Sequence, residues 1–323
     1  MSETPANGYT QRSQILGQTY ASLFPDRSER VIIDGVANNF IWYGDFFDTE
    51  QFTNTEDVLE GFFDECIQAA SNCSLSDLAD SKEELHDLVY TALSQLQQQP
   101  ISVYINSTQY GTLDYPTVMY NGIFASLYKP ANWYNLADNL AKLLKGNATA
   151  AWLAYGQDPP FGIEGEANQF VEFNDGLSGP AYWPQDREAL LKQIIPAVNT
   201  SLFGPTENGA YYQRQQWIVP RTHNFSQPES VETLNPLLIL STTYDPICPL
   251  VSAQSANGAF KDSKIVEVEG YGHCSVAVAS TCLAQHVREF LYKGQWKQIL
   301  PASLSCLVIV ADFPTHCFRR AAG

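Results

Sequence analysis

The sequence predicts an α/β fold in which part of a parallel sheet is interrupted by a large helical insertion. A β-branched run near the N-terminus and two apolar runs near the C-terminus alternate with helical segments, which implies parallel pairing of the strands. Between them, residues 51–215 show helical periodicity without that alternation. The composition is that of a globular protein, because hydrophobic residues make up 45% of the 323 residues and charged residues only 16%.

Residues 14–50 supply the first part of the predicted core. The segment QILGQTYASLF has apolar residues at helical spacing, and Pro25 ends it. The next segment, RVIIDGV over 30–36, is a β-branched run closed by Asp34 and Gly35, which is typical of a short buried strand.

Residues 51–215 form the predicted helical cap. Its helix signals include a capping box, Ser81 with Glu84, followed by apolar residues at amphipathic spacing as far as Pro100. Helical spacing also marks the stretches TNTEDVLEGFFDECIQAA, NWYNLADNLAKLLKGNATAAWLAYG and DREALLKQIIPAVNTSLFG. We therefore expect a cap of helices joined by loops rich in Gly and Pro.

Residues 216–305 complete the predicted core. The apolar run in NPLLILSTTYDPICP predicts a strand that ends in a polar turn, and SKIVEVEGYGHCS predicts a second strand with a glycine-flanked loop. A helix is predicted after each strand, in PLVSAQSANGAF and in SVAVASTCLAQHVREFLYKG, and Gly294 stops the second. Residues 306–323 lose this pattern and form an atypical tail.

Asp245 and His273 are the candidate catalytic residues. Each follows one of the two C-terminal strands, and the carboxyl ends of parallel strands meet at the edge where ligands bind. Glycines 270 and 272 let the loop turn tightly around the histidine. A serine-type triad needs a carboxylate on one ring nitrogen, so that the other nitrogen can take the proton of the nucleophile. The alternative is a capping Asp and a structural loop His.

The other histidines are expected to be structural or exposed. His86 and His286 lie on predicted helices, His223 neighbours a glycosylation triplet, and His316 lies in the tail. Neither a CxxC or HExxH motif nor a P-loop or GxGxxG motif occurs, so the sequence predicts no metal or cofactor.

Charge and hydropathy exclude some classes of partner. The formal net charge is −17, and such an acidic surface repels phosphates, which argues against nucleic acid. No apolar run approaches the roughly 18 residues of a membrane span. The N-terminus shows no basic segment followed by an apolar one, and hence no signal peptide. The sequence does not indicate an oligomeric state.

Other features predict a secreted, glycosylated protein. Five Asn-x-Ser/Thr triplets begin at Asn72, Asn106, Asn147, Asn199 and Asn224. The seven cysteines fall partly in close pairs or after key loops, as structural disulfides do. The alternative is a cytosolic protein with buried thiols.

Three segments resemble the secreted fungal and bacterial α/β-hydrolases that are similar to tripeptidyl aminopeptidases, with prolyl aminopeptidases as wider kin. LGQTYASLFPDRSERVIIDGV resembles the helix and strand after the nucleophile, NPLLILSTTYDPICPLVSAQ the acid strand, and GYGHCSVAVASTCLAQHVREFLYKG the His loop and terminal helix. The resemblance implies a serine peptidase that removes short peptides from free N-termini under a helical cap. Its partner would be a peptide substrate.

The nucleophile of this family is not found in the sequence. The family's turn has the form G-x-S-Y-G-T-x-L-G, and alignment on Leu16 and Gly17 puts Gln11 at the nucleophile and Ser13 at a glycine. Ser13 lacks the flanking glycines that the strained turn requires. We therefore expect a partial α/β-hydrolase core, truncated at the N-terminus, which lacks nucleophile and oxyanion hole and is inactive as written. An unpaired strand at 30–36 would favour aggregation.

Cysteine positions predict three disulfides. If the acid and base loops meet, Cys248 and Cys274 should be close enough to bridge. Cys282 with Cys306 would tie the last helix to the tail, and Cys66 with Cys73 would close a small loop in the cap. Cys317 is left over, and Phe173 and Arg214 stand where family members often carry cysteines.

Two other functions stay open. A non-catalytic binding protein could use the cap to hold a peptide or a partner. An esterase or lipase of the same fold would share the triad, and the cap sequence does not discriminate between esters and peptides.

Overall fold

The computed structural model describes residues 10–156, 163–293 and 303–307, which form two compact units. Residues 10–56, 163–293 and 303–307 belong to the first unit, and residues 57–156 to the second. The helical cap expected over 51–215 is therefore divided. Its later part belongs to the unit that contains the sheet.

A four-stranded sheet forms the base of the first unit. Its strands, in spatial order, are β1 (Ile32–Asp34), β4 (Leu238–Tyr244), β5 (Lys264–Tyr271) and β6 (Ser303–Leu307). Every neighbouring pair is parallel, which confirms the α/β class predicted from strand–helix alternation. Strand β6 extends the sheet beyond the two C-terminal strands that the sequence predicts. Strand β1 lies at the edge, and β4 is its partner among the described residues.

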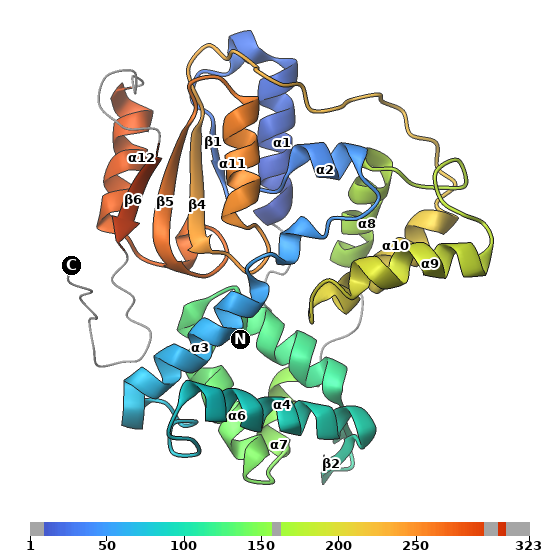
Figure 1. Ribbon diagram of the computed structural model, residues 1–323, viewed down its shortest axis with the longest axis vertical. Helices are drawn as coiled ribbons and strands as arrows, with labels where there is room; N and C mark the ends of the chain where they lie inside the picture. The colour runs from blue at the N-terminus through green and yellow to red at the C-terminus, as the bar shows by residue number, and fades with distance from the viewer. Residues whose placement is uncertain (1–9, 157–162, 294–302, 308–323) are drawn as a thin grey trace. The chain divides into compact units, whose positions relative to one another are not determined.

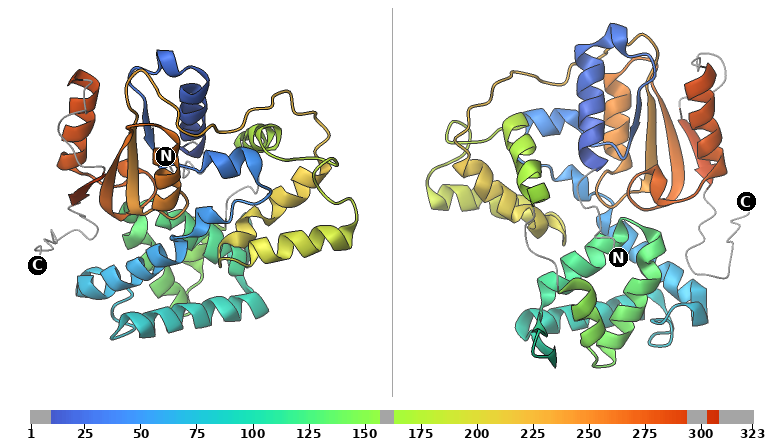
Figure 2. Two further views of the ribbon diagram at one scale, coloured as in Figure 1. Left: turned by 45° about the horizontal axis from the view of Figure 1, so that its top comes forward. Right: turned by 180° about the vertical axis from the view of Figure 1, so that it is seen from behind.

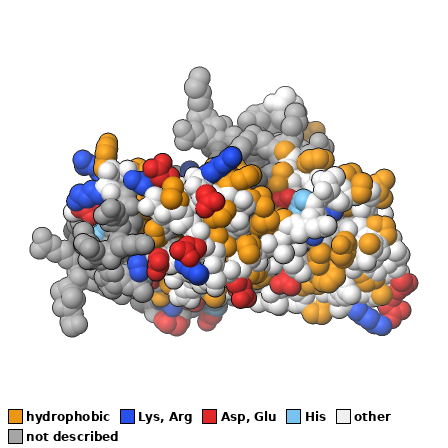
Figure 3. Space-filling model, turned by 90° about the horizontal axis from the view of Figure 1, so that it is seen from above, with side chains coloured by type: hydrophobic (Ala, Val, Ile, Leu, Met, Phe, Trp, Pro, Cys, Tyr) orange, Lys and Arg blue, Asp and Glu red, His pale blue; other side chains and the backbone are white. Residues whose placement is uncertain are grey.

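Helices α1 (Thr10–Leu23) and α11 (Leu250–Ala259) lie side by side against the sheet in Figures 1 and 2. Small residues let them approach closely: Ala21, Ala253 and Ala256 are buried with the sheet residues Ile33 and Ile239 in one core cluster. The opposite face of α1 exposes apolar side chains, namely Leu16, Tyr20 and Leu23. Figure 3 shows apolar side chains mixed with charged ones on the surface seen from above.

The remaining helices of the first unit surround this core. They are α2 (Asn39–Gly44), α8 (Ile163–Asp175), α9 (Arg187–Val198), α10 (Asn208–Gln216) and α12 (Thr281–Lys293). Helix α8 is tied to α2 by the Trp42 indole N–H, which donates to the Asp175 carboxylate at 3.0 Å. None of the helices in the described ranges is long and apolar enough to cross a membrane.

The second unit is mainly helical. Its helices are α3 (Thr55–Ala69), which begins just inside the first unit, α4 (Lys82–Gln98), α5 (Ala125–Leu127), α6 (Trp133–Leu144) and α7 (Thr149–Tyr155). The Ser81 hydroxyl accepts the Glu84 N–H at 3.2 Å, so Ser81 caps α4 as predicted. The helical prediction missed an antiparallel hairpin, β2 (Ile101–Asn106) and β3 (Gln109–Leu113).

The core of the second unit is aromatic. The buried rings of Phe62 and Trp133 meet edge to face, with centroids 5.6 Å apart. The predicted Cys66–Cys73 disulfide is present, with Cα atoms 5.3 Å apart, and it closes the loop after α3. This unit therefore has a core and a covalent link of its own.

Candidate active site

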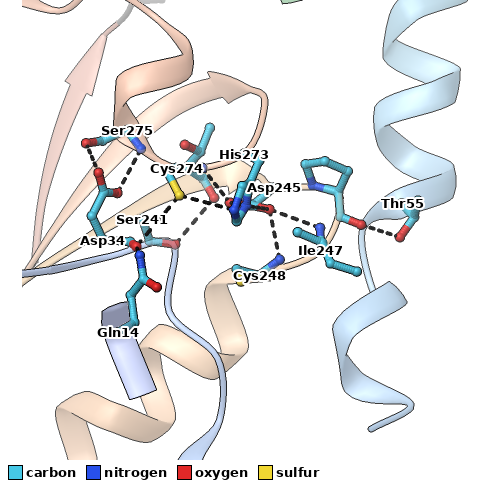
Figure 4. Close-up of polar contacts among 12 residues, drawn as sticks. Gln14, Asp34, Thr55, Ser241, Asp245, Ile247, Cys248, His273, Cys274 and Ser275 are labelled. Atoms are coloured by element: carbon cyan, nitrogen blue, oxygen red, sulfur yellow. Dashed lines mark hydrogen bonds and ion pairs between the residues drawn. The ribbon is translucent and has the colours of Figure 1, made fainter. Parts of the chain in front are cut away.

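The structure brings Asp245 and His273 together at the carboxyl edge of the sheet. Tyr244 and Tyr271 are partners in register at the ends of β4 and β5, so the residues that follow each strand meet at one level. The His273 Nδ1 lies 3.0 Å from one Asp245 carboxylate oxygen and 3.1 Å from the other (Figure 4). Both side chains are buried, at 0% and 7% residue exposure.

The Asp245 carboxylate is held by backbone amides as well as by the imidazole. One oxygen accepts the N–H groups of Ile247 at 3.0 Å and Cys248 at 2.8 Å, and the other accepts the Cys274 N–H at 2.9 Å. These hydrogen bonds compensate for the water that a buried carboxylate loses. Asp245 thus caps the turn that leads into α11 and also holds His273. A capping role, which was the alternative to a catalytic one, accounts for only some of these contacts.

Unusual backbone angles shape the loop around His273. Gly272 has φ 116°, and Cys274 has φ 61°, which is uncommon for a residue with a Cβ. Of the two glycines predicted to bend this loop, only Gly272 has a positive φ, because Gly270 still belongs to β5. Gly35, with φ 66°, lets the end of β1 approach: an added Cβ there would lie 2.3 Å from the Cys274 sulfur.

The expected Cys248–Cys274 disulfide is wrong, since both residues are buried thiols. The Cys274 sulfur points away to His273 and β1: it lies 3.3 Å from His273 Nε2 and 3.7 Å from the Asp34 carbonyl oxygen. Burial, and next the Asp245 charge, raises the pKa of the Cys248 thiol well above its usual value. Disulfide formation needs a thiolate, so this environment opposes it.

Sequence reasoning missed the role of Asp34, which it took only as the end of a strand. The Asp34 carboxylate accepts the Ser275 N–H at 2.8 Å and the Ser275 hydroxyl at 2.7 Å, and its carbonyl accepts from the Gln14 side chain. Burial raises the pKa of Asp34 while the Ser275 hydrogen bonds lower it. Asp34 ends the strand that pairs with β4, and this position could have indicated that it lies near Asp245 and His273. Asp34 fixes the residue that follows the His273–Cys274 pair.

The other predicted site residues are placed as follows. Ser13 and Gln11 fall within the helical backbone of α1, and their side chains lie outside the described residues, as does Cys317. The predicted Cys282–Cys306 disulfide is present, with Cα atoms 5.6 Å apart. Among the glycosylation candidates, Asn72 is half-buried and the exposed ones are Asn106, Asn147, Asn199 and Asn224.

A second polar site, which we call the acidic pocket, is a cavity of about 60 Å³ in the first unit. Its lining includes Asp48, Glu172, Glu207 and Arg214, and also Ile247, two residues after Asp245. The Arg214 side chain is 7% exposed and pairs with the Glu172 carboxylate at 2.6 Å. Three carboxyl groups therefore share one guanidinium.

Acidic side chains outnumber basic ones in the acidic pocket. Burial, assisted by neighbouring carboxylates, raises the pKa of Asp48 to about 7 and that of Glu207 to about 8. The Arg214 Nε is buried and has no hydrogen-bond partner among the described residues. The Arg214 guanidinium also lies 5.9 Å from the centroid of the Phe173 ring, so the two residues that replace expected cysteines are in contact.

Comparisons with known proteins agree with the predicted fold class. Residues 201–303 match an α/β-hydrolase family described as "TAP-like protein". The chain is 26% identical over 304 residues to the serine protease Hip1 of Mycobacterium bovis and to that of Mycobacterium tuberculosis. These matches cover 89% of this chain and 55% of each relative, so the chain spans about half the length of the curated relatives it matches. Residues 201–303 thus resemble TAP-like α/β-hydrolases, and the chain as a whole is similar to a serine protease.

Proposed function

We propose that this chain supplies the acid and the base of a serine exopeptidase that cleaves short peptides from free N-termini. The observation that carries the proposal is the 3.0 Å contact between Asp245 and His273 Nδ1. With Nδ1 donating to the carboxylate, Nε2, which lies 3.3 Å from the Cys274 sulfur, is the ring atom that would take the proton of a nucleophile and return it to the leaving amine. Asp245 stabilises the imidazolium that forms between these steps.

The nucleophile must come from a Gly-x-Ser-x-Gly turn, and that motif does not occur in the 323 residues. We therefore expect no hydrolysis by this chain as it stands. The coding sequence upstream of Met1 provides a direct test: an in-frame Gly-x-Ser-x-Gly before ILGQTYAS would join the missing turn to this chain, and a stop codon there would contradict that arrangement.

The acidic pocket supports a free amino terminus as the substrate group. A cavity of about 60 Å³ has room for an ammonium group and water, and Asp48, Glu172 and Glu207 outnumber the Arg214 cation. An ammonium group would offset the repulsion among the carboxylates. Because bound cations favour ionised carboxylates, such binding would lower the raised pKa values of Asp48 and Glu207 and release protons.

Catalysis is tested in a chimera. The part of M. tuberculosis Hip1 that precedes its match to this chain would be fused before Ile15, and release of product would be measured. We expect activity on peptides with a free N-terminus, and losses of about 10³-fold or more in His273→Ala and in Asp245→Asn. Preference for acyl esters over peptides would indicate an esterase. A chimera that stays fully active without His273 would contradict the proposal.

A non-catalytic peptide-binding role is the second candidate, because the acidic pocket is formed by residues of this chain alone. Calorimetry on the intact chain would compare a free tripeptide with its N-acetylated form at pH 6.5. Binding of the free peptide alone, with proton release seen as a dependence on the buffer, supports the pocket. Equal binding of both forms would exclude recognition of the amino group, as would unchanged binding in Glu207→Gln.

We also propose that the protein is secreted and glycosylated. The two disulfides of the described chain are typical of oxidising compartments, and four of the five glycosylation asparagines are exposed. Expression through a secretory pathway should yield a product whose electrophoretic mobility increases on treatment with an N-glycosidase. An unchanged mobility would count against glycosylation.

A further inference from the structure

A third polar cluster lies where α12 contacts β6. Cys282 and His286 are four residues apart on α12, so they lie on the same helical face, and Cys306 belongs to β6 (Figure 1). One sulfur or ring-nitrogen atom from each residue lies within 4.8 Å of those of the other two. His286 is expected from the sequence to be structural or exposed, and no sequence motif connects it with these cysteines.

The cluster contains more than a disulfide requires. The Cys282–Cys306 bridge accounts for both sulfurs, but a disulfide needs no imidazole beside it. Two thiolates and an imidazole are instead a ligand set typical of Zn²⁺, with a fourth position left for water or another ligand. Cys306 is buried, whereas Cys282 and His286 are half-buried, so an ion can reach the cluster from solvent on the α12 side.

We propose that, when the Cys282–Cys306 bridge is reduced, Cys282, His286 and Cys306 bind one Zn²⁺ ion. A dithiol delivers two electrons and two protons to the S–S bond, which becomes two thiols while the dithiol becomes a disulfide. Zn²⁺ then displaces the two thiol protons and takes the neutral imidazole as third ligand. The two thiolate charges balance the charge of the ion.

The metal would preserve the tie between α12 and β6 before the disulfide forms or after it is reduced. Both states connect the same two elements, one by a covalent bond and the other through an ion. Binding to the folded chain and not to the unfolded one stabilises the fold. The proposal is independent of peptide hydrolysis, because none of the three residues belongs to the Asp245–His273 site.

The test uses the full chain, reduced with a dithiol that is then removed without oxygen. Titration with Co²⁺ should produce thiolate-to-cobalt charge-transfer absorption at one ion per chain, and Zn²⁺ should abolish it. Cys282→Ser should eliminate this signal, and His286→Ala should weaken affinity by about 10–100-fold or more. The oxidised chain should show no thiolate-to-cobalt band.

The chain offers a matched control in its other disulfide. The double variant Cys66→Ser and Cys73→Ser removes a cysteine pair that belongs to no such cluster in the described part of the chain, and it should bind the ion as the unmodified chain does. Loss of binding in this double variant would overturn the proposal. Unchanged affinity in His286→Ala, or no binding to the reduced chain, would overturn it as well.

Reduction could unfold the chain, and circular dichroism would detect this. The proposal then predicts that Zn²⁺ restores the native spectrum of the reduced chain but not that of reduced His286→Ala. Failure of Zn²⁺ to restore the spectrum, or equal restoration in both, would contradict the site.

Discussion

The first unit buries carboxyl groups in two places, and these differ in the groups that surround each carboxyl. Asp245 is fully buried, and it accepts three backbone N–H groups and the imidazole of His273. In the acidic pocket, three carboxyl groups share Arg214, and the pKa values of Asp48 and Glu207 rise to about 7 and 8. Backbone donors thus surround the Asp245 carboxylate, whereas burial and other carboxyl groups act on Asp48 and Glu207.

The Asp245–His273 site and the acidic pocket therefore differ in how their carboxyl groups are held. Around Asp245, three backbone N–H groups hold the carboxylate, and the carboxylate in turn holds the imidazole of His273. In the acidic pocket the acidic side chains outnumber the basic ones, which is the basis of the proposal that it binds an amino group. Four experiments test this contrast, in order of decreasing expected effect.

The largest effect is expected at Asp245. Asp245→Ala leaves the buried N–H groups of Ile247, Cys248 and Cys274 without their acceptor, and we expect a loss of about 3–5 kcal/mol in the free energy of unfolding. Denaturant unfolding of the full chain would measure it. Asp245→Asn keeps an acceptor and should cost less than half as much; equal losses would mean that shape rather than these hydrogen bonds matters.

Gly35→Ala tests how tightly the same site is packed. The new Cβ would lie 2.3 Å from the Cys274 sulfur at a positive φ, so we expect a loss of about 2–3 kcal/mol. Gly146→Ala is the matched control, because Gly146 also has a positive φ, at 88°, but nothing lies within 4 Å of its added Cβ. The control should cost about 1 kcal/mol. If both variants lose the same amount, the close packing at Gly35 contributes nothing.

Arg214→Met removes the cation shared by the acidic pocket. We expect a loss of about 2 kcal/mol at pH 8, less than for a fully buried pair because Glu172 keeps 21% of its side chain exposed. At pH 5 the loss should shrink, since more of the carboxyl groups hold protons. Arg187→Met, on the exposed side of α9, should change stability by less than about 0.5 kcal/mol at either pH. A loss that does not depend on pH would point to packing on Phe173.

The smallest effect is the pH dependence of the pocket itself. The folded pKa values of Asp48 and Glu207, about 7 and 8, lie above those of an unfolded chain. The folded state therefore binds more protons, and its stability is greatest below about pH 4 for these groups and falls as pH rises through 7 and 8. We expect a decline on the order of 1–2 kcal/mol between pH 5 and 9, given the partial exposure of both side chains.

The double variant Asp48→Asn and Glu207→Gln should flatten this decline. Thermal unfolding across the pH range, with the unmodified chain in parallel, measures the slope. An equally steep decline in the double variant would assign it to other groups.

Features that depend on strand order or on neighbouring residues could be predicted from the sequence, whereas side-chain directions and contacts between distant residues could not. The Asp245–His273 pair could be predicted because both residues follow adjacent parallel strands, and strand order alone brings their backbones together. The prediction of a Cys248–Cys274 bridge was wrong because it depends on the direction of the Cys274 sulfur. Cys274 has a positive φ, which cannot be predicted for a residue other than glycine. The acidic pocket was missed because Asp48, Glu172 and Glu207 are far apart in sequence and none belongs to a motif.

The helical part shows the same limit. The cap at Ser81 and the amphipathic spacing of α4 are local signals, and both are confirmed, while the Glu84 carboxylate accepts the N–H of Asp80. The division of the cap between two units depends on which helices pack against the sheet, and periodicity does not contain that information. The hairpin of β2 and β3 is short and mostly exposed, and the alternation of Ile101, Val103 and Ile105 in β2 was passed over because it directly follows a helix within a segment expected to be helical.

The pairing of β1 with β4 has a consequence for folding speed. Ile32 and Leu238 are neighbours in the sheet, although more than 200 residues of chain separate them. Closing so long a loop is entropically costly before the first strand contact is made, and sheets of high contact order fold slowly. The helical unit at 57–156 has its own core and disulfide. If it folds first, it shortens the loop, so the insertion would set the rate at which the sheet edge with Asp245 and His273 is assembled.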